Sequence, residues 1–333
     1  MSHANISIFV PHKGCPNQCS FCNQKSIAST SFVPNGEFVE KECATALEKF
    51  KGDTSCAQIA FFGGSFTAID RSFMVELLEA ANKYIGKGKF ESIRISTRPD
   101  CIDEEILDIL KRYNVRSIEL GAQSMNESTL LVNRRGHTVA DVVNASELIK
   151  EKGFELGLQM MVGLYGDDKN DAFITAEKIA ELMPDTVRIY PTIVIKDTYL
   201  AELYTLGKYL PLNTDEAVDI CAKLLDFFES KDIKVIRLGL HDSETLKSDM
   251  LAGPYHPAFR ELCESRRLLL RLEQKLSDLP KGRYRVFVSS SMVSKFVGQK
   301  KENLLKLSEK GYQVRICTDE KIQGNDFITE REN

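Results

Sequence analysis

Short apolar runs alternate with longer segments of helical periodicity over the first 240 residues of this 333-residue chain. Six runs have the character of buried strands, at residues 6–10, 57–62, 92–96, 117–121, 154–161 and 186–190. Helical spacing of apolar residues covers 39–50, 73–85, 103–113, 139–152, 171–182 and 215–230, and another apolar run follows at 233–240. This alternation predicts an α/β fold with a parallel sheet. Because no G-x-G-x-x-G follows the first strand, a barrel or partial barrel is favoured over a dinucleotide-binding sheet.

Polar or glycine-rich residues follow the predicted strands, where a barrel carries its functional groups. They include Gly63-Gly64-Ser65, Ser96-Thr97 and Gln123-Ser124, and Gln159 lies within the fifth strand. Glycine-rich turns are common structural features in such folds, so no single one identifies a site. Their joint placement predicts a binding site at this end of the sheet.

Three cysteines follow the first strand at the spacing C-x3-C-x2-C: Cys15, Cys19 and Cys22. Four thiolates would close a zinc site or a cubane cluster, whereas three leave one iron of a [4Fe-4S] cluster without a protein ligand. The alternative is a zinc knuckle that borrows a distant fourth ligand. The loop itself offers no second C-x2-C and no histidine pair, and His12 before it is the nearest candidate.

Composition sets the class of protein. With 43% hydrophobic residues, the chain can build one large domain of about 200–250 residues and a small one. No apolar run approaches 18 residues and no signal-peptide pattern is present, so we expect a cytoplasmic protein without a membrane partner. Nine cysteines without a regular framework indicate thiols and a metal site, not disulfides.

Charge is distributed unevenly along the chain. Residues 1–240 carry a net charge of −7, and residues 281–315 carry +7. A basic segment attached to an acidic body indicates a polyanionic partner.

The cysteine loop, with Phe21 before the third cysteine, resembles the signature of radical S-adenosylmethionine (radical SAM) enzymes. The resemblance implies a partial (β/α)6 TIM-like barrel with two cofactors, a [4Fe-4S] cluster and S-adenosylmethionine. It implies that Cys15, Cys19 and Cys22 hold the cluster at the catalytic centre. Phe21 would pack against the adenine.

Further motifs resemble the radical domain of the Elongator catalytic subunit, which modifies the wobble uridine of tRNA. They keep their order over residues 6–240: Phe62 to Phe66, Thr97 to Asp100, Gly121 to Ser124, Arg135 to Thr138, Met160 to Leu164 and Ile189 to Ile195. The resemblance implies that Gly63 and Gly64 receive the methionyl amino group, although Ser65 stands where the family has an acidic residue. It also implies that Gln123, Ser124 and Gln159 form hydrogen bonds with the ribose hydroxyls or the carboxylate of S-adenosylmethionine. Ser96 and Thr97 share this expected role. Lys196, in a loop that the family uses near the cofactor, is the basic residue chosen for the catalytic site.

The last 90 residues differ from the Elongator subunit, because they are too few for its acetyltransferase domain. We expect a barrel at 1–240, a connector and helix at 241–280, and a small basic α/β module at 281–333. The turn at Gly298 before a basic helix resembles K-homology RNA modules, although Lys301 replaces their second glycine. Candidate RNA contacts are Arg134, Arg135, His137, Lys295, Lys300 and Lys301, and a solvated polar surface is the alternative for each.

The leading hypothesis is a radical SAM enzyme that modifies RNA, with tRNA as the expected substrate. The alternative is a radical SAM enzyme for a small molecule or peptide, similar to the oxygen-independent coproporphyrinogen oxidases. A non-catalytic metal-binding or RNA-binding module is the third hypothesis. The family implies a one-electron donor such as a ferredoxin or flavodoxin.

Overall fold

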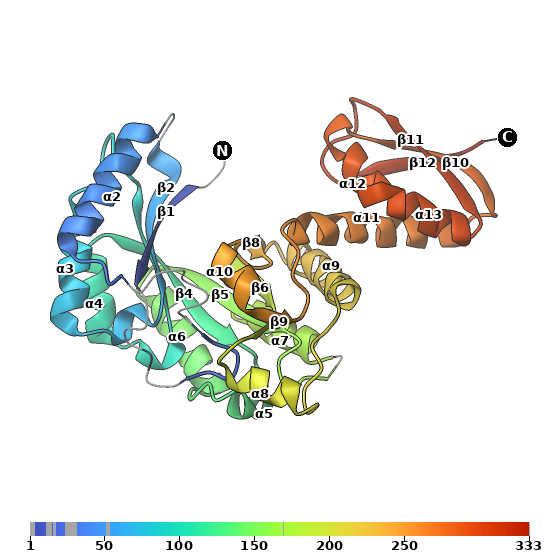
Figure 1. Cartoon of the computed structure of the whole chain (residues 1–333). Coiled ribbons are helices and arrows are strands. Elements are labelled where there is room, and N and C mark those ends of the chain that lie inside the picture. Colours follow the sequence, from blue (N-terminus) through green and yellow to red (C-terminus); the bar gives the residue numbers. More distant parts are fainter. Residues whose placement is uncertain are drawn as a thin grey trace.

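A curled sheet of seven parallel strands forms the body of the molecule (Figure 1). The structure is a computed structural model that describes residues 4–10, 15, 18–23, 32–50, 54–168 and 170–332. In spatial order the strands are β1 (Ala4–Val10), β2 (Ala57–Gly63), β3 (Ser92–Thr97), β4 (Val115–Gln123), β5 (Glu155–Val162), β6 (Thr186–Pro191) and β8 (Lys234–Leu238). The predicted parallel half-barrel is confirmed, with one correction. The apolar run at 233–240 pairs with β6 and makes the sheet seven-stranded instead of six-stranded.

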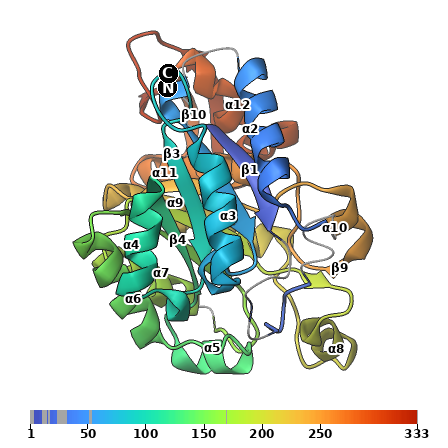
Figure 2. The ribbon, with the colours of Figure 1, turned by 90° about the vertical axis from the view of Figure 1, so that its left-hand side faces the viewer.

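Helices cover the outer face of this sheet, and Figure 2 shows α3 and α4 in front of its first strands. The six predicted helices are α2 (Gly36–Lys49), α3 (Arg71–Asn82), α4 (Glu104–Arg112), α6 (Val139–Glu151), α7 (Asp171–Glu181) and α9 (Thr214–Ser230). Side-chain caps fix the starts of five of these helices, all except α7. Asp103 accepts a hydrogen bond from the Ile106 amide at 2.8 Å, and Thr138 forms a capping box with Asp141.

Shorter elements that the sequence did not predict lie mostly around the carboxyl ends of the strands. They are α5 (Glu127–Val132), α8 (Tyr199–Thr205), α10 (Glu244–Asp249) and the strand pair β7 (Val194–Ile195) and β9 (Met250–Ala252). Single 3-10 turns are η1 (Thr54–Cys56), η2 (Phe66–Ala68) and η3 (Pro99–Cys101).

The two faces of the sheet differ in chemistry because successive side chains of a strand point to opposite faces. Ile118 and Leu120 of β4 belong to the main apolar core, which the outer helices share. Between them, Glu119 points to the other face and is 1% exposed. It accepts hydrogen bonds from Arg94 at 3.0 Å and from Arg188 at 2.5 and 2.8 Å. Burial alone would raise the pKa of Glu119, but the charges of Arg188 and Arg94 outweigh it and hold the pKa below its usual value.

A second core lies in the C-terminal module. The helix α11 (Phe259–Ser277) leads into β10 (Gly282–Val288), η4 (Ser290–Met292), α12 (Val293–Val297), η5 (Gln299–Lys301), α13 (Glu302–Glu309), β11 (Tyr312–Thr318) and β12 (Phe327–Arg331). The predicted helix at 300–310 starts two residues late, because Lys300 and Lys301 have left-handed backbones with φ of 50° and 65°. The strand β12 was not predicted. None of the helices in the described ranges has the length and apolar character needed to cross a membrane.

Candidate active site

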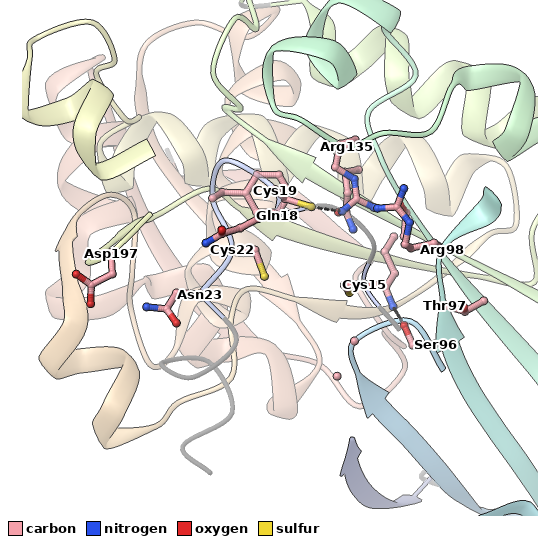
Figure 3. Close-up of a pocket in the computed structure, with 16 residues that line it drawn as sticks. Cys15, Gln18, Cys19, Cys22, Asn23, Ser96, Thr97, Arg98, Arg135 and Asp197 are labelled. Carbon is pink, nitrogen blue, oxygen red and sulfur yellow. Dashed lines mark hydrogen bonds between the residues drawn. The ribbon is translucent and has the colours of Figure 1, made fainter. Parts of the chain in front are cut away.

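A cavity of about 640 Å³ opens at the carboxyl ends of the strands, where the sequence placed the site (Figure 3). Eleven of the sequence-predicted site residues line it: Cys15, Cys19, Phe21, Cys22, Gly63, Gly64, Ser96, Thr97, Gln123, Arg135 and Gln159. The other lining residues are Gln18, Asn23, Arg98, Gly121 and Asp197. The fold therefore gathers segments up to 180 residues apart in sequence around the cysteine loop.

The cysteine loop is held by hydrogen bonds from distant elements. The Ser20 amide donates to the Asn133 carbonyl at 3.0 Å, and the Ser20 hydroxyl donates to Asn133 Oδ1 at 2.6 Å. The Leu200 amide donates to the Ser20 carbonyl at 2.8 Å, and Asn23 Nδ2 donates to the Lys196 carbonyl at 3.0 Å. Asn133, at the end of α5, is fully buried. Asn133 was not predicted from the sequence, because a single buried asparagine after a short helix has no pattern of its own.

Phe21 fixes the loop on its apolar side. It packs with the buried residues Val194 and Leu200, which belong to β7 and α8. It also lines the cavity, so a planar group could lie against it there. The expected contact with adenine stays a prediction.

The three thiols face one cavity, and their electrostatics reflect their closeness. Burial of the Cys22 thiol, with added effects of Cys19 and Cys15, raises its pKa to about 12. The metal-free protein therefore keeps Cys22 protonated at neutral pH, and metal binding must release that proton. Arg135 Nη1 donates to Cys19 Sγ at 3.0 Å.

The donor set fits an iron-sulfur cluster, since three thiols share the cavity with a cationic donor. Among residues that the structure describes, no group of three or more His, Cys, Asp or Glu side chains already stands in a metal-holding arrangement. The thiols would have to draw together around the cluster. His12, the nearest candidate for a fourth zinc ligand, lies outside the described residues.

Glycines near the carboxyl ends of β2 and β4 form part of the cavity wall. Gly63 has φ of +126°, and a Cβ atom there would overlap the Val10 carbonyl oxygen. A Cβ at Gly121 would lie 2.8 Å from Gln123 Nε2. Backbone is thereby exposed to the cavity, which leaves room for a ligand against the main chain.

Polar atoms around the cavity include some without protein partners. In the described part of the chain, Gln123 Oε1 and Arg135 Nε are buried and make no hydrogen bond. Buried polar groups are normally satisfied, so these two atoms indicate a polar ligand in the cavity. Arg98 differs, because Asp100 accepts two hydrogen bonds from it at 2.8 Å.

Three predicted residues do not line the cavity. Ser65 is buried and shares a hydrogen bond of 2.8 Å with the Thr97 hydroxyl. Ser124 accepts a hydrogen bond from the Asn126 amide at 3.1 Å beneath the site. Lys196 Nζ donates to the Ser248 carbonyl at 2.8 Å, while its neighbour Asp197, with a left-handed φ of 58°, lines the cavity.

The residues predicted to contact RNA lie in different parts of the structure. Arg135 is 7% exposed and belongs to the cavity. His137 is buried, and burial together with the charges of Arg135 and Arg98 lowers its pKa to about 4, so it is neutral at neutral pH. Arg134 is exposed, stacks on the Tyr199 ring at 3.5 Å, and lines a second cavity of about 650 Å³ that shares Gln18 with the first. The remaining three, Lys295, Lys300 and Lys301, lie in the C-terminal module.

Comparison with known families gives two matches along the chain. The model described as Radical SAM superfamily matches residues 9–179, and the model described as Radical_SAM C-terminal domain matches residues 184–268. The first covers slightly more than half of the chain. It includes the end of β1, the cysteine loop and the whole of β2 to β5.

Curated relatives are similar over the same part. An uncharacterized protein of Methanocaldococcus jannaschii is 30% identical over 66% of this chain and 65% of its own length. The tRNA uridine(34) acetyltransferase of that organism is 32% identical over 52% of this chain and 36% of its own. Elongator complex protein 3 of Danio rerio is 30% identical over 49% of this chain and 33% of its own. The match thus spans about a third of the length of each of these last two relatives.

One solved structure supports the fold. The archaeal Methanocaldococcus infernus Elp3 with an N-terminal deletion superposes with a TM-score of 0.64 at 20% identity, over 82% of this chain and 63% of that one. This likeness shows that the two proteins share a fold over most of this chain.

Proposed function

Because the chain belongs to the radical SAM superfamily, we propose that it is an enzyme of that family which modifies RNA, with tRNA as its substrate. The family's cofactors are a [4Fe-4S] cluster and S-adenosylmethionine. The observation that carries the chemistry is the meeting of three thiols, the glycines at the ends of β2 and β4, and unpartnered polar atoms on one cavity.

The cavity residues divide between the two cofactors. Cys15, Cys19 and Cys22 would hold the cluster, leaving one iron without a protein ligand. When bound, the cluster and S-adenosylmethionine supply a 5′-deoxyadenosyl radical by one-electron cleavage. Gly63 and Gly64 would receive the methionyl part against the backbone, and Gln123 would accept a hydrogen bond through its free Oε1.

Arg135 supplies positive charge to the cavity, where an anionic cofactor group could bind. Arg135 donates to Cys19 and to the Gly121 carbonyl, at 2.7 Å, and keeps Nε free. Within the described residues no carboxylate forms an ion pair with Arg135, so its charge is available to an anionic cofactor group. The buried network around Glu119 lies behind this site, with Gln159 donating both to Glu119 at 2.9 Å and to Ser96 at 3.1 Å. These bonds fix the floor of the cavity.

RNA as the substrate class rests on the relatives. Two of them carry names that refer to tRNA uridine modification or to Elongator, and their similarity falls on the radical domain. Acetyl transfer is not included in the proposal, because the matched third of those proteins does not account for their whole activity. Arg134, exposed beside the second cavity, is placed to meet an RNA phosphate. A ferredoxin or flavodoxin is the proposed electron donor.

The test is anaerobic reconstitution with iron and sulfide, followed by reduction with S-adenosylmethionine in the presence or absence of unfractionated tRNA. Formation of 5′-deoxyadenosine is read by chromatography. We expect cleavage that rises with tRNA, is lost in Cys19→Ala and is retained in Cys56→Ala. Cys56 is the matched control because it precedes β2, at the strand end away from the cavity.

The other outcomes contradict the proposal at different levels. Cleavage that is indifferent to tRNA would reject the RNA substrate and favour a small molecule or peptide. Failure to take up a cluster, with no cleavage, would reject the assignment of the cavity.

A further inference from the structure

The three-stranded sheet of the C-terminal module is covered on one side only. Its order is β11-β10-β12, with β11 parallel and β12 antiparallel to β10. Tyr284, Val286 and Val288 of β10 point to the side of α11, α12 and α13 and are buried there with leucines of α11. In Figure 1 these helices lie together on one side of the strands. No described element covers the opposite side.

The strand register identifies the residues of this open face. Arg283, Arg285 and Phe287 of β10 alternate with the buried set. They pair with Gln313, Arg315 and Cys317 of β11, and Phe287 and Arg285 also pair with Ile328 and Glu330 of β12. Arg283, Arg285 and Arg315 are all exposed, and Ile328 is 54% exposed. We call these eight residues the open face.

Arginine and aromatic groups are combined at its centre. The guanidinium carbon of Arg285 lies 5.5 Å from the centre of the half-buried Phe287 ring. Arg285 also forms an exposed ion pair with Glu330 at 3.1 Å, which contributes little to stability. Arg283 donates to Gln313 at 3.1 Å. Arg315 has no ion-pair partner within the described ranges.

The cations on the helical side are engaged differently. Lys295 pairs with Glu264 at 2.5 Å, Lys306 with Glu302 at 2.5 Å and Lys310 with Glu273 at 2.8 Å. These pairs neutralise much of the positive charge that the sequence concentrates in residues 281–315. The charge that remains available on the sheet comes from Arg283, two residues before Arg285 on β10, and from Arg315, which pairs with Arg285 on β11.

We propose that the open face binds a single-stranded segment of RNA, which deepens and rests on the proposed RNA substrate. Sheet surfaces bind such segments by stacking bases on aromatic rings, while arginines contact phosphates. Phe287 and Arg285 form the stacking centre, and Arg283 and Arg315 meet the backbone. The face holds RNA outside the catalytic cavity, so it contributes affinity without touching the reacting atoms.

The experiment measures binding of the full chain to fluorescent unfractionated tRNA and to a 12-nucleotide oligouridylate at several salt concentrations. We expect the double variant Arg283→Gln, Arg315→Gln to bind roughly tenfold more weakly, with a salt slope reduced by about 1.4. Phe287→Leu, which keeps an apolar side chain but removes the ring, is expected to weaken binding about fivefold with little change in salt slope. The control variant Lys223→Gln, Lys231→Gln removes the same charge from exposed positions on or beside α9 and is expected to bind like the parent.

The outcomes separate this surface from the proposed function. If both open-face variants bind RNA like the parent while tRNA still stimulates 5′-deoxyadenosine formation, the surface is wrong and the RNA substrate stands. If the parent binds RNA through this face but tRNA does not stimulate cleavage, the surface stands and the proposed substrate fails. If the variants instead keep RNA binding and lose reduction by ferredoxin, the face serves an acidic protein and the inference is overturned.

Discussion

Truncating Asn133 to alanine is expected to loosen the cysteine loop and so reduce cluster uptake. The side chain makes three hydrogen bonds, with the Ser20 hydroxyl at 2.6 Å, the Thr129 carbonyl at 2.8 Å and the Tyr165 carbonyl at 2.7 Å. Each such bond contributes about 0.5–1.5 kcal/mol, and buried groups left unpaired cost more. We therefore expect Asn133→Ala to lose about 2–4 kcal/mol of unfolding free energy. Chemical unfolding measures this loss, and iron bound per chain after reconstitution measures cluster uptake.

A matched control separates the local effect from a general one. Asn303 is also buried, and its Nδ2 donates to Ser265 Oγ at 3.0 Å and the Lys295 carbonyl at 3.1 Å, but it lies in the C-terminal module. Asn303→Ala should lose similar stability and bind iron normally. Ser20→Ala, which removes one of the loop's bonds, should have a smaller effect on both quantities. The reasoning is refuted if Asn133→Ala takes up iron like the parent, or if Asn303→Ala impairs uptake equally.

Three further predictions concern the sheet and its cavity. Gly63→Ala places a Cβ against the Val10 carbonyl at a φ of +126°. We expect the free energy of unfolding, measured in urea, to fall by about 3 kcal/mol and S-adenosylmethionine to bind more weakly by calorimetry. Parent-like values for both would contradict the strained turn. His137 has a pKa of about 4 in the fold against 6.5 in the unfolded chain, so its contribution to stability is complete above pH 6.5 and falls by about 3 kcal/mol as pH drops to 4. The stability difference between the parent and His137→Gln should shrink over that interval, and a difference independent of pH would count against the assignment. Glu119→Gln removes the buried carboxylate that both Arg94 and Arg188 contact, and we expect it to lower the free energy of unfolding by about 3–5 kcal/mol. A loss under about 1 kcal/mol would mean that water already solvates these two arginines.

The sheet could be predicted because its strands are continuous apolar runs and its main helices are long enough to show periodicity. Short elements have no such signal. The helices α5 and α8 contain six and seven residues, fewer than two full turns, and β12 has the polar sequence FITER. The seventh strand was visible as an apolar run, but its pairing with β6 depends on tertiary structure.

The site was predictable where spacing or backbone chemistry defines it. The three cysteines could be identified by their spacing, and Gly63 by its place in a glycine turn after a predicted strand. Lys196 and Asp197 show where sequence reasoning stops, since the left-handed turn at Asp197 places that residue, and not its neighbour, in the cavity wall. Arg135 was assigned to RNA because it is basic and follows a strand, and only the fold shows it buried against Cys19.

The helix α11 has a consequence for how the molecule melts. Its 19 residues extend about 28 Å, and they belong to both cores. Phe259 and Cys263 pack into the core of the large sheet, whereas Leu272 and Leu276 pack into that of the module. Each half of α11 has only about ten residues, a length at which an isolated helix is marginal in water, so neither half persists when its partner core is lost. The large sheet and the C-terminal module therefore unfold in one cooperative transition. Loss of packing in either one destabilises the other, because both pack on α11.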